Sequence, residues 1–173
     1  MKKTVLISKN LTRLCDRLNE ATMFISSWLL FLMFLFSCVV IFFRYALANP
    51  ISWSSDILMP AFVWTSMLGI SIGVRTASHM AVDSLVKLLP QSVQGAIYVA
   101  TRLLMGSFCV FLVIVGANVT YAARETRWGI LQWTTEFFYV AFPISFFLIF
   151  LYCLDDILKK CVLSLQSVTR KEA

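Results

Sequence analysis

Charged residues are scarce in this chain of 173 residues, since only 14% are Asp, Glu, Lys or Arg, against about 25% in a typical soluble domain. Apolar residues make up 60% of the chain, and its mean hydropathy is +0.82. A disordered chain is poor in apolar residues, and a soluble domain carries more charge on its surface. The composition therefore excludes both classes and predicts an integral membrane protein.

The chain also has few histidines and no cysteines at C-x-x-C spacing. A single His excludes a His-based metal cluster or a bis-His haem held within one chain. The five cysteines include no C-x-x-C pair and three lie in apolar runs, so we expect reduced thiols. The sequence has no phosphate loop, nucleophile elbow or metal-ligand spacing. We therefore expect a non-enzyme that binds no cofactor, metal or nucleic acid.

Four uncharged apolar runs are long enough to cross a bilayer as helices. A helix rises about 1.5 Å per residue and the hydrocarbon core is about 30 Å thick, so a span needs about 20 residues. The runs cover residues 21–43, 57–74, 103–123 and 137–154 and contain 18 to 23 residues each. We predict an all-α integral membrane protein with four transmembrane helices, forming a single membrane domain over residues 1–173.

Two further helical segments are expected outside the spans. In the segment 4–19, apolar residues follow one another at spacings of four, three and four. They are Ile7, Leu11, Leu14 and Leu18. This spacing predicts an amphipathic helix at the phospholipid headgroups, with targeting or partner binding as the alternative. The second span is expected to continue as a cytoplasmic helix over residues 75–89, because Pro90 ends it.

The distribution of Lys and Arg predicts the orientation in the membrane. Twelve of them lie before the first span, in the loop 75–102 and in the C-terminal tail. The other two connections hold three, namely Arg44, Arg124 and Arg127. The positive-inside rule therefore places both termini in the cytoplasm.

The second span carries a row of small residues. These residues are Ser66, Gly69, Gly73 and Ala77, and the row contains a Gly-x-x-x-Gly motif. Small side chains let the backbone of another helix approach closely. The row is consistent with packing among the four helices of this chain and equally with packing on a second subunit.

Polar residues within the spans are few. Asn118, in the third span, is predicted to hydrogen-bond to a neighbouring helix rather than to bind an ion. At the outer ends of the first two spans, Arg44 and Asp56 are expected to form an ion pair.

Three ionisable residues follow the second span at intervals of four residues and share one helix face. They are Arg75, His79 and Asp83. We interpret this face as structural, either solvated or bound to headgroups. A proton relay through His79 is the alternative, but no carboxylate continues such a relay through the membrane.

Residues 43 to 83 contain, in order, Arg-Tyr, Trp, an acid, Gly-x-x-x-Gly-x-Arg, His and Val-Asp. The residues of this pattern outside the glycine motif are Arg44, Tyr45, Trp53, Asp56, Arg75, His79 and Asp83. The order resembles that of the small, DctQ-like membrane subunit of a tripartite ATP-independent periplasmic (TRAP) transporter. In that family two acids usually follow the Trp, whereas Ser55 and Asp56 stand here.

The resemblance implies a small, non-catalytic scaffold subunit in a bacterial inner membrane. In such a transporter, a periplasmic substrate-binding protein captures an organic acid anion, and a large multi-span membrane subunit imports it by sodium symport. Sodium is expected to bind that large subunit, which leaves this chain without a cofactor. The resemblance leaves the cargo open between sialic acid and C4-dicarboxylates.

A self-sufficient small homodimeric membrane transporter is the alternative function. Such transporters keep a carboxylate inside the first span, and residues 21–43 contain none.

Overall fold

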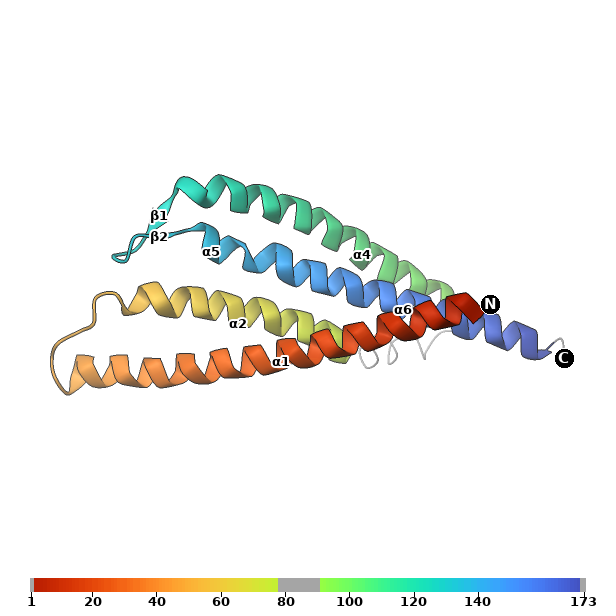
Figure 1. Ribbon diagram of the computed structural model, residues 1–173, viewed down its shortest axis with the longest axis horizontal. Coiled ribbons are helices and arrows are strands. Elements are labelled where there is room, and N and C mark those ends of the chain that lie inside the picture. The colour runs from red at the N-terminus through yellow and green to blue at the C-terminus, as the bar shows by residue number, and fades with distance from the viewer. Residues whose placement is uncertain (1, 78–90, 172–173) are drawn as a thin grey trace.

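The computed structural model describes residues 2–77 and 91–171, and four long helices run side by side through it (Figure 1). They are α1 (Lys2–Tyr45), α2 (Ser54–Ala77), α4 (Gln91–Ala122) and α6 (Ala141–Lys171). The stretches long and apolar enough to cross a membrane are Ser8–Tyr45, Ser54–Thr76, Val99–Glu125 and Glu136–Lys159. The prediction of a largely α-helical chain with four helices long and apolar enough to cross a membrane is therefore confirmed.

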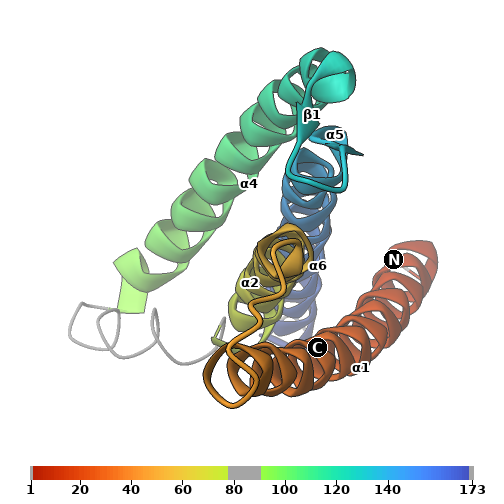
Figure 2. The same ribbon diagram turned by 90° about the vertical axis from the view of Figure 1, so that its left-hand side faces the viewer.

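α6 is the central helix of the bundle. α4, α2 and α1 all pack against it, and α1 also packs against α2 (Figure 2). The apolar core is small and centres on Cys109 of α4 with Ile149 and Cys153 of α6. Most apolar side chains face outward instead, and the most apolar 18-residue window of α1 has none of its residues buried. Outward apolar surface is what a hydrocarbon solvent allows, because lipid tails are as apolar as the side chains.

α1 is one continuous helix, so the amphipathic segment 4–19 is not a separate element. No Gly or Pro interrupts the chain between this segment and the first span. Part of the segment packs on α6: the Thr12 hydroxyl donates to Asp155 at 2.7 Å, and Cys15 is fully buried. A distinct interfacial helix is thus not confirmed. The predicted extension 75–89 lies outside the described residues from residue 78 onward.

Two short strands and two short helical turns lie between α4 and α6. They are η1 (Ala123–Glu125), β1 (Arg127–Trp128), β2 (Trp133–Thr134) and α5 (Glu136–Tyr139). The strands are antiparallel, with Trp128 opposite Trp133. This hairpin was not predicted from the sequence. Its turn depends on Gly129, whose φ of +77° is a conformation that glycine adopts without a steric penalty.

The fourth predicted span, 137–154, is interrupted near its start. α5 ends at Tyr139 and α6 begins at Ala141. Pro143 lies in the first turn of α6, and because it has no N–H it cannot donate a hydrogen bond to Tyr139 one turn earlier. The proline therefore divides the span into a short and a long helical segment.

Candidate functional site: a charge cluster joining four helices

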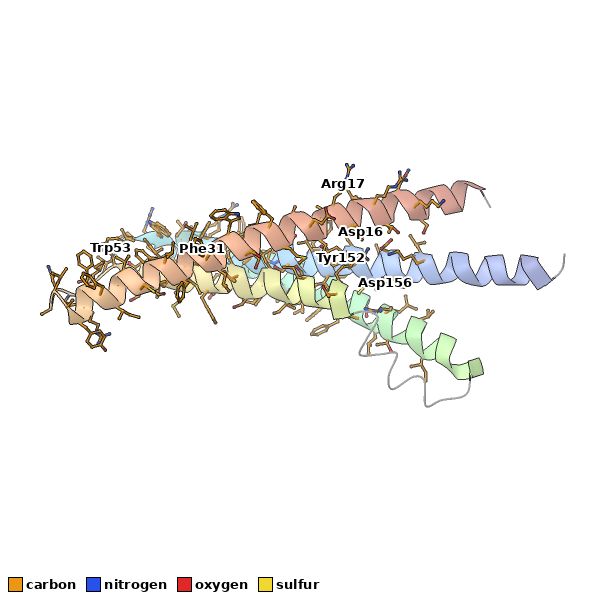
Figure 3. The ribbon with its side chains drawn as sticks, turned by 90° about the horizontal axis from the view of Figure 1, so that it is seen from below. Asp16, Arg17, Phe31, Trp53, Tyr152 and Asp156 are labelled. Carbon is orange, nitrogen blue, oxygen red and sulfur yellow. The ribbon has the colours of Figure 1, made fainter. Side chains whose placement is uncertain are left out.

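Six charged side chains meet near the C-terminal end of α2, partway along α1, α4 and α6, and Figure 3 shows Asp16, Tyr152 and Asp156 in this region. All four long helices contribute to this charge cluster. Its members are Asp16 of α1, Arg75 of α2, Arg102 of α4, and Asp155, Asp156 and Lys159 of α6. Three carboxylates and three cations give the cluster a formal charge of zero.

Arg75 is the hub of the charge cluster. Its Nη2 lies 2.7 Å from Oδ1 of Asp16, and its Nη1 lies 2.7 Å from Oδ2 of Asp155. The guanidinium carbon also stands 5.4 Å from the ring centroid of Tyr152, within the range of a cation–π contact. Only arginine has a planar fork that binds two carboxylates in fixed directions while stacking on a ring. One side chain of α2 thereby joins α1 and α6.

The two adjacent carboxylates of α6 are almost fully buried, with Asp155 0% and Asp156 3% exposed. Asp155 accepts a hydrogen bond from Thr12 and lies 2.9 Å from the Lys159 ammonium. Asp156 lies 3.5 Å from Nη2 of Arg102. A buried carboxylate without such partners would lose its hydration with no compensation. The cations from α2 and α4, together with Lys159, therefore allow this pair to remain charged inside the bundle.

The interpretation of Arg75 as part of a solvated or headgroup-bound face was wrong, because its side chain is 10% exposed and turns into the bundle. A structural role for Arg75 agrees with its ion pairs. His79 and Asp83 lie outside the described residues.

The other members of the charge cluster were not singled out from the sequence. One signal could have found them, since Arg75, Arg102 and Asp155 each border an apolar run on the same predicted side of the membrane. Opposite charges at one depth in a small bundle have few partners other than one another.

The expected ion pair between Arg44 and Asp56 was also wrong. Asp56 is 6% exposed and accepts a hydrogen bond from the backbone N–H of Leu131 at 2.9 Å. The Arg44 guanidinium instead lies over the ring of its neighbour Tyr45, 5.8 Å from the centroid. The hairpin between α4 and α5 brings its turn onto the start of α2, and Asp56 thereby fastens the hairpin to α2.

Trp53, the remaining aromatic residue of the family pattern, packs near the Asp56 contact. Its ring lies 6.0 Å from that of Phe36 on α1. Trp53 therefore links the start of α2 to α1.

Gly129 is expected to be indispensable for this outer contact. A Cβ at Gly129 would collide with the Asp56 carboxylate, and φ of +77° disfavours any L side chain. We expect Gly129→Val to lower the free energy of unfolding by about 2–4 kcal/mol, through backbone strain and a lost hydrogen bond. Thermal unfolding in detergent measures this loss. Gly106→Ala is the control, since its Cβ would meet Phe150 at an ordinary 4.0 Å. Equal melting temperatures for the two variants would contradict the expectation.

The row of small residues on α2 is largely uncovered. A Cβ added at Gly69 or Gly73 would meet no atom within 4 Å, and both glycines are exposed. Ser66 is half-buried, and the side chain of Ala77 is not among those that the structure describes. Within the described part of the chain, neither glycine is used to bring α2 close to another helix. An interface with a second protein remains a prediction.

Four apolar helices, a buried charge cluster near the C-terminal end of α2 and a short outer hairpin define a small multi-pass membrane protein. The chain belongs to the DctQ family, since the model of the family described as "Tripartite ATP-independent periplasmic transporters, DctQ component" matches residues 33–162. It is thus a small component of a TRAP transporter, as its residue pattern indicated. Membership of a transport family also fits the expectation of a non-enzyme.

Two named relatives lie in the same transporter class. The chain is 33% identical over 118 residues to the C4-dicarboxylate TRAP transporter small permease protein DctQ of Pseudomonas aeruginosa, covering 61% of this chain and 52% of that protein. It is 34% identical over 71 residues to the sialic acid TRAP transporter permease protein SiaT of Haemophilus influenzae, covering 41% of this chain and 11% of that protein. The matched part therefore amounts to about half of the first relative and about a tenth of the second.

Proposed function

We propose that this chain is the non-catalytic scaffold subunit of a sodium-driven TRAP transporter that imports an organic acid anion. A large multi-span membrane subunit moves the substrate with sodium, and a periplasmic binding protein delivers it. The position of the charges carries this proposal. Residues 21–43, 57–74, 103–123 and 137–154 contain no ionisable Asp, Glu, Lys, Arg or His, whereas an ion-coupled carrier keeps such groups or broken helices near the midplane.

The size of the SiaT relative supports a large partner. The segment similar to this chain makes up 11% of that permease, so a segment like part of this chain and a much longer remainder share one polypeptide there. We propose that the longer part is a separate subunit here. The uncovered face of α2 at Ser66, Gly69, Gly73 and Ala77 is its proposed contact.

The names of the two relatives support the proposed cargo class. One relative is named for C4-dicarboxylates and the other for sialic acid, and both cargoes are carboxylate anions. An organic acid anion, either sialic acid or a C4-dicarboxylate, is therefore the cargo that we propose for the assembled transporter.

The proposed location is a bacterial inner membrane with both termini in the cytoplasm. Twelve Lys and Arg against three support this orientation. The first turn of α1 and the last turn of α6 also lie at the same end of the bundle (Figure 1). The charge cluster then faces the cytoplasm and the hairpin faces the periplasm. Phospholipid headgroups contact Leu14, the exposed apolar residue in the described part of the segment 4–19.

Reconstitution in liposomes tests the proposed function. With the large permease and the binding protein present, we expect uptake of an organic acid that depends on an inward sodium gradient. We expect none from this chain alone, because it has no ionisable group at the midplane. Uptake by this chain alone would support the self-sufficient homodimer instead. Equal uptake by the large permease with and without this chain would contradict the scaffold role.

A further inference from the structure

Asn118 lies on α4 at membrane depth and faces away from the rest of the bundle. It is exposed, and it precedes the end of its apolar run at residue 123 by five residues, or about 8 Å along the helix. Thr120, two residues further on and about 200° around the helix, is buried. Because α4 packs chiefly on α6, the Asn118 carboxamide faces hydrocarbon in the isolated chain.

Within the described residues the Asn118 carboxamide forms no hydrogen bond, unlike two hydroxyl groups of the same span. The Ser107 hydroxyl donates to the carbonyl of Leu104 at 2.9 Å, and the Thr120 hydroxyl donates to that of Gly116 at 2.7 Å. Among the residues in the described ranges, none forms a hydrogen bond with the Asn118 side chain. The amide has two N–H donors and a carbonyl acceptor, and lipid tails satisfy none of them. The side chain is therefore stable in a membrane only when another polar group covers it.

The surroundings of Asn118 offer a surface that fits a helix. Leu104, Phe111 and Ile114 lie within about 40° of Asn118 around the axis of α4, and each is more than half exposed. Beside this face, a groove of about 200 Å³ separates α4 from α6. Its lining includes Val115 and is apolar, so a partner helix on α4 can insert an aliphatic or aromatic side chain there.

We propose that a transmembrane helix of the large permease lies along this face of α4 and hydrogen-bonds to Asn118 through a polar side chain or a free backbone carbonyl. The inference rests on the function proposed above and assigns one helix face within that assembly. In the SiaT relative, one segment similar to this chain belongs to the same polypeptide as one much longer part. This one-to-one ratio favours a permease helix, rather than a second copy of this chain, as the partner of the α4 face.

Site-directed photocross-linking tests this contact in the full chain co-expressed with the large permease. Benzoylphenylalanine replaces Ile114, which is 57% exposed and one turn from Asn118. Irradiation of membranes is expected to join the two subunits covalently. Asn118→Leu is expected to reduce both this product and the permease that co-purifies by about three- to ten-fold, the range for one interhelical hydrogen bond. Val110→Leu, at a 39% exposed position on the flank of α4, is expected to change neither.

Each outcome distinguishes this inference from the function on which it rests. If the wild-type chain retains the permease while position 114 labels lipid or a second copy, this inference alone is overturned. If the wild-type chain retains no permease, both proposals fail. Asn118→Leu should leave the melting temperature of the isolated chain unchanged, since the side chain is exposed and hydrogen-bonds to none of the described residues. A fall in that temperature would place Asn118 within the bundle and overturn the inference.

Discussion

Arg75→Met is expected to destabilise the isolated chain by about 3 kcal/mol, the lower part of the range for breaking a buried ion pair from one side. Methionine keeps most of the length and apolar character of the side chain but removes the charge that faces Asp155 and Asp16. The lower part of the range applies because Asp155 retains Thr12 and Lys159, while Asp156 retains Arg102. The melting temperature of the purified chain in detergent measures the effect.

Two further variants show whether the effect comes from the charge cluster. Asp155→Asn in the Arg75→Met background should recover part of the stability, because it removes the carboxylate left without its arginine. Arg17→Met is the control: Arg17 follows Asp16 directly and its side chain is exposed (Figure 3), so the change should stay within about 0.5 kcal/mol. If the Arg75→Met chain has the same melting temperature as the wild type, the charge cluster contributes no stability.

Gly73→Leu is expected to abolish assembly with the large permease while leaving the isolated chain folded. The Cβ position of Gly73 meets no atom of the described residues within 4 Å, so a side chain can start there without a clash at its first atom. On an assembled complex it would hold two helix backbones apart. We expect at least about a ten-fold loss of co-purified permease, with loss of uptake, at an unchanged melting temperature.

The comparison with other variants separates packing from proton chemistry. Ile70→Leu keeps the side-chain volume on the same exposed face and should assemble normally. His79→Ala, beyond the described part of α2, should assemble and support uptake near the wild-type level. If Gly73→Leu transports normally while His79→Ala assembles without transporting, the scaffold hypothesis is wrong and the relay through His79 replaces it.

The four spans could be predicted from the sequence because each is an uncharged run of sufficient length. The break before α6 could have been placed by Pro143, which the apolar count treats as one more uncharged residue. The outer hairpin gave no such signal, since its strands have two residues each and are set by the ladder between Arg127 and Thr134. Hydropathy measures the free energy of transfer into lipid. It contains no information about which short segments between the spans pair as strands.

For the candidate site, the sequence indicated individual residues but not the residues that they contact. The family pattern drew attention to Arg75 and Asp56, but it gave neither residue its partner. Asp56 was paired with Arg44 because the two are close in the chain, whereas the fold brings Leu131 to it from 75 residues away. Arg75 likewise contacts Asp155, 80 residues away. Such pairings depend on which helices pack against each other. A single sequence does not specify these packing neighbours.

The length of α1 has a consequence for the bilayer around the protein. Its uncharged run, residues 21–43, contains 23 residues or about 35 Å of helix, and Asp16 on one side of this run is held by Arg75. A hydrocarbon core of about 30 Å is somewhat thinner than this run. Since the ion pair restrains α1 from sliding along its own axis, the difference is expected to be absorbed by tilt or by local thickening of the lipid. Membrane thickness thereby becomes a variable to which this helix responds.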